Sequence, residues 1–335
     1  MTMNPRLSVI IATYSRARLL DECLQHLAIQ AFLPGDEVIV VDNASVDDTA
    51  AIVARHQATF PAPLRLIHEP QPGKSHALAR ALPAAHGDVL AFLDDDVNVD
   101  AGWLAVVRAT MRDSSIGLMG GRVAPRWESH VPDWMRSAPY QHPRLGAPLG
   151  LLEYPAGVVE LGPRTVLGAN MAVRRHVFDV VGGFATHLGK LRGTLLSGED
   201  HELCLRVQRA GFKAVYVPGA IVHHWVPAER ARVGYFLQWF YWSGITHAIM
   251  DAETGGERNF SPAAHPRSVM GLPFYLIKRA MAGAFRILKS LALGNRTAAL
   301  HNLIDVAFVA GYAAHQWGLT SRQPVSSASI TPEAA

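Results

Sequence analysis

The stretch 88–97, DVLAFLDDDV, decides the fold of this chain. Its apolar half, Asp88–Leu93, reads as a buried strand, and three consecutive carboxylates follow, Asp94, Asp95 and Asp96. Adjacent anions at the end of a core strand are costly unless a cation or strong hydrogen-bond donors lie close by. Oxygen ligands of this kind suit Mg²⁺ or Mn²⁺, ions that commonly also hold substrate phosphates. We therefore expect this strand to deliver acids to a metal ion and a diphosphate.

Three other strand-like runs precede this one, and helical patterns separate them. Strands that alternate with helices predict right-handed βαβ units and a mainly parallel, Rossmann-like sheet flanked by helices. The expected strands are Leu7–Ala12, Glu37–Val41 and Leu64–His68, and the expected helices are Arg16–Gln30, Ser45–His56 and Lys74–Ala85.

Polar side chains follow the ends of these strands. Tyr14 comes after the first strand, Asp42 after the second, and Asp94–Asp96 after the fourth. An acid at the tip of the second strand can accept a hydrogen bond from a nucleotide base or a ribose hydroxyl. Because ligands of parallel sheets bind beyond the carboxyl ends of the strands, we expect these groups to share one site.

The second half of the chain has weaker periodicity. Residues 102–163 are rich in Pro, Gly and Trp, and we expect a helix, Trp103–Asp113, then loops and irregular strands on the acceptor side. A more regular unit follows, for which the pattern predicts a strand at Gly168–Val173, helices at Arg175–Val181 and Asp200–Ala210, and a strand at Lys213–Val217.

Two further groups in this half contain residues that could take part in a reaction or bind a metal ion. Glu199 and Asp200 stand at the start of a predicted helix, where the helix dipole favours an ionised carboxylate that can accept a proton. An ordinary acidic first helical turn is the alternative. His223 and His224 follow a short apolar run, and a neutral imidazole is a common metal ligand. Whether these two histidines indicate a metal site depends on the other motifs.

Composition limits the class of protein. Hydrophobic residues make up 49% and charged residues 18%, as in an ordered globular protein, and the net charge of +3 is too weak to indicate nucleic-acid binding. Two cysteines indicate a reducing compartment and exclude a disulfide scaffold. The start of the chain lacks a leader pattern, and no uncharged apolar run reaches the ~20 residues of a spanning helix. We expect a cytoplasmic protein.

The C-terminal region is basic. No acid occurs between Arg258 and Ile304. A helical wheel places Lys278, Arg279, Arg286 and Lys289 on one face, and Leu276, Ile277, Ala280, Met281, Ala284, Ile287, Leu288 and Leu291 on the other. Such a helix can lie in an anionic membrane interface, which would make the protein peripheral on the inner face of the cell membrane. The alternative is a helix packed on the domain with a solvated basic face.

The ordered set of motifs resembles the family 2 glycosyltransferases, inverting nucleotide-sugar transferases with the GT-A fold. The resemblance covers about residues 6–245, and it is carried by SVIIATY (8–14), VDNAS (41–45), FLDDD (92–96), GGF (182–184), GED (198–200) and HH (223–224). It implies a GT-A domain over 1–250, with a nucleotide-binding half at about 6–115 and an acceptor half at about 116–250. A basic helical extension over 251–320 and a disordered tail over 321–335 would follow.

The resemblance also implies roles for single residues. Tyr14 would pack against the base, and Asp42 would hydrogen-bond it. Asp96 would coordinate Mg²⁺ or Mn²⁺ with Asp94, and His224, or else His223, would complete the metal site. Asp200 would be the catalytic base with Glu199 as its neighbour. The remaining residues expected to bind the nucleotide-sugar are Thr13, Arg16, Asn43, Lys74, Asp94, Asp95 and Asn170.

The implied reaction is metal-dependent, inverting transfer of a hexosyl group from a UDP-, GDP- or dTDP-sugar to a hydroxyl group. The acceptor would be a glycan or a lipid-linked molecule, in polysaccharide, glycolipid or other glycoconjugate synthesis, and no nucleic acid would bind. Two alternatives stay open: a sugar nucleotidyltransferase, and a catalytically inactive protein that binds a nucleotide-sugar or a glycan.

Overall fold

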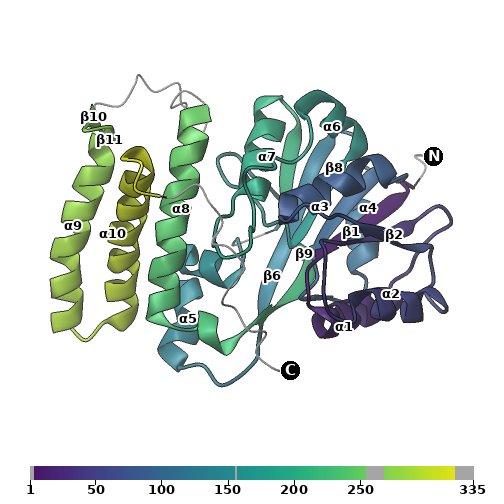
Figure 1. Cartoon of the computed structure of the whole chain (residues 1–335), viewed down its shortest axis with the longest axis horizontal. Coiled ribbons are helices and arrows are strands. Elements are labelled where there is room, and N and C mark those ends of the chain that lie inside the picture. Colours follow the sequence, from purple (N-terminus) through teal and green to yellow (C-terminus); the bar gives the residue numbers. More distant parts are fainter. Residues whose placement is uncertain (1–3, 155–156, 254–267, 321–335) are drawn as a thin grey trace.

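The computed structural model describes residues 4–154, 157–253 and 268–320. It consists of a twisted sheet flanked by helices, with a group of long helices standing beside it (Figure 1). The mainly parallel sheet, its covering helices and the C-terminal helices are as the sequence predicts. The expected disordered tail, 321–335, lies outside the described residues.

The main sheet has nine strands in the described part of the chain, in the order β3-β2-β1-β4-β8-β6-β9-β5, with β7 also paired to β9. The first four strands form a parallel block, and β8 inserts antiparallel between β4 and β6. The strands are β1 (Leu7–Thr13), β2 (Glu37–Asp42), β3 (Leu64–His68), β4 (Val89–Asp94), β5 (Val97–Val99), β6 (Ile116–Trp127), β7 (Val159–Glu160), β8 (Asn170–Arg174) and β9 (Lys213–Val226).

Two central strands differ from the sequence expectation. The sequence predicts loops and irregular strands where the structure has β6. The reason is that Gly120, Gly121 and Pro125 interrupt the apolar pattern of this strand. Pairing with β8 on one side and β9 on the other keeps it extended. β9 continues nine residues beyond the expected end at Val217, to Val226, because its second half pairs with β5 and the end of β6.

Helices cover both faces of the sheet, and their apolar sides fill its core. The second helix begins at Thr49 and not at Ser45 as expected. Ser45 Oγ instead accepts a hydrogen bond from the Ser15 backbone N–H at 2.8 Å, which fixes the loop beyond β1. The helices are α1 (Ala17–Ala28), α2 (Thr49–Gln57), α3 (Lys74–Ala81), α4 (Trp103–Thr110), α6 (Arg175–Val181) and α7 (Glu199–Arg209), with the 3-10 turn η1 (Leu82–Ala84).

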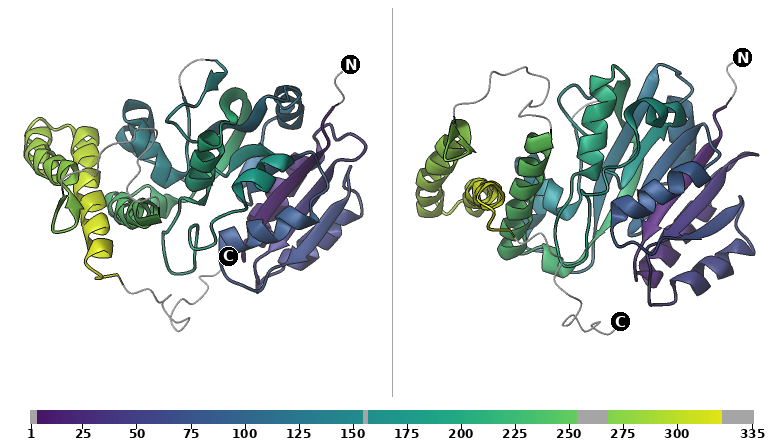
Figure 2. Two further views of the ribbon diagram at one scale, coloured as in Figure 1. Left: turned by 90° about the horizontal axis from the view of Figure 1, so that it is seen from above. Right: turned by 45° about the horizontal axis from the view of Figure 1, so that its top comes forward.

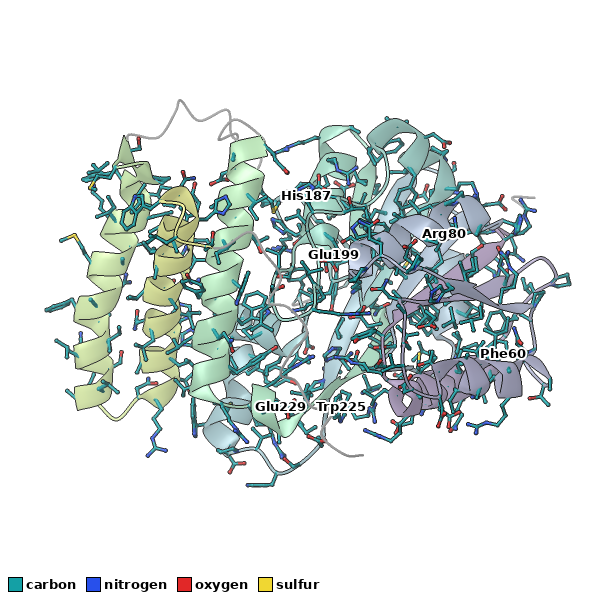
Figure 3. The ribbon with its side chains drawn as sticks, in the orientation of Figure 1. Phe60, Arg80, His187, Glu199, Trp225 and Glu229 are labelled. Atoms are coloured by element: carbon teal, nitrogen blue, oxygen red, sulfur yellow. The ribbon has the colours of Figure 1, made fainter. Side chains whose placement is uncertain are left out.

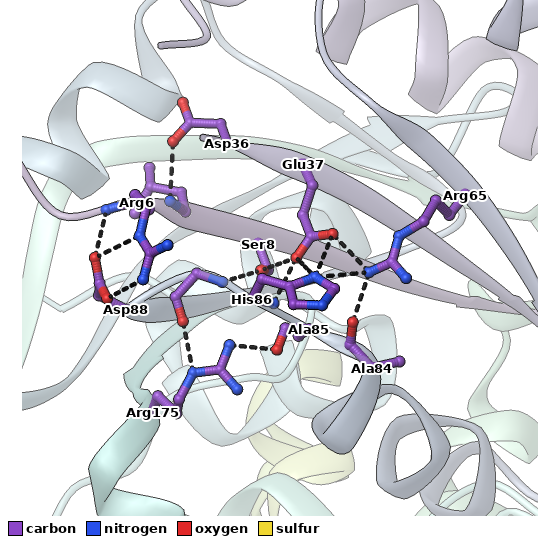
Figure 4. Close-up of polar contacts among 12 residues, drawn as sticks. Arg6, Ser8, Asp36, Glu37, Arg65, Ala84, Ala85, His86, Asp88 and Arg175 are labelled. Carbon is purple, nitrogen blue, oxygen red and sulfur yellow. Dashed lines mark hydrogen bonds and ion pairs between the residues drawn. The ribbon is translucent and has the colours of Figure 1, made fainter. Parts of the chain in front are cut away.

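A polar network joins the amino ends of the parallel strands (Figure 4). Glu37 on β2 accepts hydrogen bonds from Ser8 Oγ at 2.7 Å, from Arg65 Nη2 and from the His86 backbone N–H at 2.6 Å each. Asp88 binds Arg6 in the same way. These side chains satisfy one another at this edge, so the acids at the carboxyl edge are the ones that remain for chemistry.

Long helices follow the sheet and stand beside it (Figure 2). α8 and α10 pack so closely that a Cβ in place of the glycine hydrogen at Gly311 would overlap the carbonyl oxygen of Tyr241. None of the helices in the described ranges is long and apolar enough to cross a membrane. The elements are α5 (Asp133–Gln141), η2 (Pro143–Leu149), η3 (Ala228–Arg230), α8 (Val233–Glu253), β10 (Ser268–Val269), β11 (Leu272–Pro273), α9 (Phe274–Ala292) and α10 (Arg296–Gln316).

Candidate active site

Strand register brings the first polar groups together at the carboxyl edge of the sheet. Thr13 on β1 is paired with Asp42 on β2, and Ala12 is paired with Asp94 on β4. Because the three strands are parallel, the side chains that follow them meet at one edge. The predicted clustering of Tyr14, Asp42 and the acids after β4 is therefore what the strand pairing produces.

The side chain of Asp95 turns inward toward β1 and α1. It accepts hydrogen bonds from Thr13 Oγ1 at 2.8 Å and from Arg16 Nη1 at 3.0 Å. Arg16 Nη1 also donates to Asp96 Oδ2 at 2.9 Å. Burial raises the pKa of Asp95 to about 6, with repulsion from Asp96 adding to it against attraction by Arg16. One arginine thus partly neutralises two buried acids.

A cluster of two acids and one histidine forms where β5 pairs antiparallel with β9. Val97 is paired with His224, so the imidazole comes to lie beside the acids. Asp94, Asp96 and His224 each offer one ligand atom, and these atoms lie within 4.8 Å of one another. Among the described residues, Asp96 Oδ1 and His224 Nδ1 are buried without a hydrogen-bond partner. Two carboxylates and an imidazole with unused atoms fit a divalent metal ion.

The protonation tendencies of this cluster agree with that fit. Burial lowers the pKa of His224, although attraction to Asp96 opposes the shift, and a neutral imidazole is the form that binds metals. Burial alone would raise the pKa of Asp96, but attraction to His224 and Arg16 outweighs it, and the pKa falls. The ionised carboxylate is the form of Asp96 that can serve as a metal ligand.

The neighbouring histidine points away from the cluster. His223 Nε2 lies 2.8 Å from Asp100 Oδ1, and both side chains are partly exposed. Successive residues of a strand face opposite sides of a sheet, so His223 and His224 cannot both reach the acids. Of the two alternatives that the sequence left open, the geometry brings only His224 to Asp94 and Asp96.

Lys74 connects this cluster with the start of α7. Its Nζ lies 2.5 Å from Asp94 Oδ1 and 3.5 Å from Glu199 Oε1. Burial disfavours its charge, yet attraction to Asp94, Glu199 and Asp200 raises the pKa of Lys74. Its backbone N–H donates to the carbonyl of Lys190, which ties α3 to the loop before α7. The ammonium group of Lys74 therefore lies between Asp94 at the end of β4 and Glu199 at the start of α7.

The two expected catalytic acids begin α7, between the sheet and α8 (Figure 3). Gly198 precedes them with φ of 103°, and a Cβ there would overlap Thr246 of α8. Asp200 accepts hydrogen bonds from the backbone N–H groups of Gly168 and His201, both at 2.7 Å. Burial, then repulsion from Asp200, raises the pKa of Glu199. Asp200 is thus held as an acceptor while Glu199 faces Lys74.

Arg192, in the loop before α7, packs against the side chain of Tyr14. The guanidinium of Arg192 lies 3.9 Å from the centre of the Tyr14 ring, and Arg192 Nη2 donates to the carbonyl of Asn43 at 3.0 Å. Asp42 Oδ1 accepts a hydrogen bond from the Ser45 backbone N–H at 2.8 Å. Arg192 thus contacts both Tyr14, the ring expected at a nucleotide base, and Asn43, the residue after Asp42.

Two expected binding residues use their amides inside the protein. Asn170 is buried, accepts from Trp103 Nε1 at 2.9 Å and donates to the carbonyls of Arg122 and Ala220. Asn43 donates to the carbonyls of Glu69 and Gln71 and accepts from the Gly73 backbone N–H, so it shapes the loop before Lys74. The structure does not present either amide to the other site residues.

Two cations in the site, Lys190 and Arg230, were missed by sequence reasoning. Lys190 is exposed, yet partial desolvation and then repulsion from Arg230 lower its pKa to about 8. The charge of Arg230 contributes to lowering the pKa values of Asp96 and His224. Neither residue belongs to an acidic or histidine motif, so no motif of that kind marks either of them as a site residue.

A cavity of about 390 Å³ opens on the other side of α7. His201, the neighbour of Asp200, lines it, and burial followed by the influence of His247 lowers the pKa of His201 to about 4. Arg144 and Arg279 reach the cavity and both donate to Asp305. Its aromatic lining consists of Trp239, Phe240, Tyr275, Phe308 and Tyr312.

Comparison with protein families and known proteins gives concordant results. The model of the family described as "Glycosyltransferase like family 2" matches residues 5–242. The glucosyl-dolichyl phosphate glucuronosyltransferase of Haloferax volcanii is 24% identical over 258 residues, which are 73% of this chain and 77% of that protein. The succinoglycan biosynthesis protein ExoM of Rhizobium meliloti is 30% identical over 217 residues, which are 64% of this chain and 65% of that protein.

Solved structures share the fold. The mannosyltransferase PcManGT from Pyrobaculum calidifontis, solved with GDP-Man and Mn²⁺, superposes with a TM-score of 0.65 at 24% identity, covering 95% of this chain and 88% of that one. GalNAc-T7, solved with UDP, GalNAc and Mn²⁺, gives a TM-score of 0.52 at 16% identity, covering 77% of this chain and 52% of that one.

Proposed function

Because the chain belongs to glycosyltransferase family 2, we propose that it transfers a sugar from a nucleotide-sugar to a hydroxyl group of an acceptor, with inversion at the anomeric carbon. The reaction would serve polysaccharide or other glycoconjugate synthesis. The observation that carries the proposal is the convergence of Asp94, Asp96 and His224 with Lys74, which in turn contacts Glu199 beside Asp200.

The donor would lie across the carboxyl edge of the parallel strands. Tyr14 and Asp42 would contact the base, and Lys74, Lys190 and Arg230 would face the diphosphate. Asp94, Asp96 and His224 would hold Mg²⁺ or Mn²⁺, which would stabilise the negative charge of the diphosphate leaving group. Both solved neighbours were determined with Mn²⁺, which supports this choice of metal.

Asp200 would act as the general base. Its carboxylate takes the proton of the acceptor hydroxyl as the hydroxyl oxygen bonds to the anomeric carbon. The bond from that carbon to the diphosphate oxygen breaks in the same step, and the nucleoside diphosphate leaves with the bonding electrons. Attack occurs opposite the leaving group, so the configuration inverts and no covalent enzyme intermediate forms. The two backbone N–H bonds to Asp200 orient it for this role.

The acceptor would occupy the cavity between α7 and the C-terminal helices. His201, the residue after the proposed base, lines this cavity, and aromatic rings with two arginines line the rest of it. Rings suit the apolar faces of sugars, and guanidinium groups suit phosphates. A glycan or a lipid-linked phosphate is therefore the acceptor class that we propose, and the name of the Haloferax volcanii relative supports it.

A donor screen tests the proposed function. Purified protein is incubated with UDP-, GDP- and dTDP-sugars, a lipid-linked or glycan acceptor, and Mn²⁺ or Mg²⁺, and nucleotide products are measured. We expect one donor to yield free nucleoside diphosphate only when acceptor and metal are present, and a glycoside whose anomeric configuration is inverted by NMR. Pyrophosphate as product would indicate nucleotidyl transfer, and metal-dependent binding without turnover of any donor would indicate an inactive binding protein.

A further inference from the structure

The outermost helix of the described structure, α9, exposes a row of large apolar side chains. It packs on α10 through Leu276 and Gly283, which are buried, and lies on the side away from the sheet in every view (Figures 1 and 2). The opposite side of the helix carries Phe274, Met281, Phe285 and Leu288, and the last three are 70%, 74% and 71% exposed. Their spacing of seven, four and three residues makes one continuous stripe.

This stripe continues beyond both ends of the helix. Val269 and Met270 are exposed in the β10–β11 hairpin that precedes α9, and Leu293 is exposed in the turn that follows it. Trp317 of α10, half exposed, donates from Nε1 to the carbonyl of Met270 at 2.9 Å. We call the exposed side chains from Val269 to Leu293 together the α9 outer surface. Its length of about 28 Å follows from a 19-residue helix.

The structure shows which side chains of the two predicted faces pack against the rest of the protein. Met281, Leu288 and Leu291, on the apolar face of the helical wheel, are exposed. Arg279, expected on the solvated basic face, turns inward to Asp305 at 2.6 Å. The helix packs on a narrow strip around Leu276 and Gly283, because a glycine lets the helix axes approach and leaves the larger side chains outside.

Basic side chains flank the apolar stripe. Lys278 and Lys289 lie beside it, and Arg286 lies further round the helix. Within the part of the chain that the structure describes, none of the three forms an ion pair. The sequence has no acid from Arg258 to Ile304 that could neutralise them. The outer surface is therefore apolar along its middle and positively charged along one flank.

This combination favours a lipid surface over a second copy of the chain. A two-fold dimer would place the same patch against itself and bring Lys278, Arg286 and Lys289 close to their own copies. No acid of α9 could relieve that repulsion. An anionic bilayer supplies negative headgroups for the lysines and an acyl boundary for the apolar stripe, which is how in-plane amphipathic helices bind.

We propose that the α9 outer surface docks the protein on an anionic membrane, with α9 parallel to the bilayer plane. Phe274, Met281, Phe285 and Leu288 enter the headgroup–acyl boundary, and Lys278 and Lys289 contact lipid phosphates. This inference does not depend on the transfer reaction, since it concerns a face that no proposed substrate occupies.

Vesicle co-sedimentation of the full chain tests it. We expect binding to vesicles of equal parts phosphatidylcholine and phosphatidylglycerol at about 0.1 M NaCl, and weaker binding as salt rises. Phosphatidylcholine vesicles should bind about tenfold less, because the lysines lose their partners. Phe285→Ser with Leu288→Ser should lower the partition coefficient at least about tenfold, since two large apolar groups no longer insert.

Matched variants separate the surface from general effects. Lys278→Glu with Lys289→Glu should weaken binding, whereas Arg55→Glu with Arg112→Glu, the same charge change on the sheet unit, should not. Ile29→Ser, which removes a side chain 74% exposed on the far side of the chain, should also bind normally. The proposal would be overturned if the Phe285/Leu288 variant bound as well as the parent, or if both vesicle types were bound equally. It would also be overturned if the chain bound no vesicles and formed a dimer that these substitutions dissociate.

Discussion

The imidazole Nε2 of His224 lies 3.4 Å from Oδ1 of Asp96, and within the described residues that carboxylate oxygen accepts no hydrogen bond. Asp96 directly precedes β5 and His224 lies within β9, and the antiparallel pairing of β5 with β9 places the two residues side by side. A buried acceptor without a donor is costly. The arrangement is explained if a cation completes it.

Replacing His224 should weaken metal binding. We expect His224→Ala to raise the dissociation constant for Mn²⁺ at least about tenfold, because one of three ligands is lost, a change of about 1.4 kcal/mol or more. Isothermal titration calorimetry measures it. His223→Ala is the control, since His223 pairs with Asp100, and it should stay within about twofold. The reverse ranking of the two variants would exclude this metal cluster.

Replacing Asp200 should separate binding from turnover. Asp200→Asn keeps the shape of the side chain but removes its basicity, so kcat should fall by about 10²–10⁴-fold while the donor KM changes little. Steady-state kinetics with the identified donor measure both. Glu202→Gln, another acid of the first turn of α7, should lose much less activity. Similar losses in both variants would mean that Asp200 is an ordinary first-turn acid.

Arg230 should contribute to donor affinity. Arg230→Met removes a cation whose charge lowers the pKa of Asp96 and of His224, and we expect the donor KM to rise roughly tenfold or more, as for loss of a charge-assisted hydrogen bond. Arg232→Met, two residues further on and exposed, is the matched control. Nucleoside diphosphate inhibition constants should shift in parallel with KM. An unchanged inhibition constant would place the diphosphate elsewhere.

The cavity beside α7 should determine acceptor affinity. Trp239→Ala should raise the acceptor KM roughly three- to tenfold and leave the donor KM unchanged, because one aromatic contact is removed. Tyr140→Ala, an exposed aromatic outside the cavity, should leave both constants unaltered. A rise in the donor KM instead would assign the cavity to the nucleotide-sugar.

Asp305 should make stability depend on acid pH. Burial alone would raise its pKa, but the hydrogen bonds from Arg279 and Arg144 outweigh it and lower the pKa below the ordinary value of 3.8. The folded state then holds the ionised form more tightly, so this stabilisation is complete above about pH 4 and is lost as pH falls through the folded pKa.

Thermal unfolding from pH 7 to pH 3 measures this effect. Asp305→Asn should destabilise the protein by about 1–3 kcal/mol at pH 7, and the difference from the parent should shrink below pH 4. Asp179→Asn, which removes an exposed acid of α6, should leave the melting temperature unchanged. A constant difference across the pH range would show that the ionised form of Asp305 has no special role.

Much of the fold was predictable because its signals are local. The apolar runs before Thr13, Asp42 and Asp94 end within one or two residues of the observed strands, and short apolar runs between amphipathic helices leave few alternatives to a parallel sheet. Chain order then places the ends of β1, β2 and β4 at one edge, so the acids of the site could be named without coordinates. β6 could not be found in this way, since only its neighbours in the sheet keep its glycines and proline extended.

The sequence by itself determined the acids that end the parallel strands, because hydrophobic periodicity and connection rules act over a few residues at a time. The tertiary structure decided which histidine reaches those acids, that the amide of Asn170 is used within the sheet, that Lys190, Arg192 and Arg230 join the site, and which side of α9 is exposed. These outcomes depend on strand register and on contacts between residues distant in the chain. A shift of one residue in β9 would exchange His223 for His224, and no local pattern in the sequence records that register.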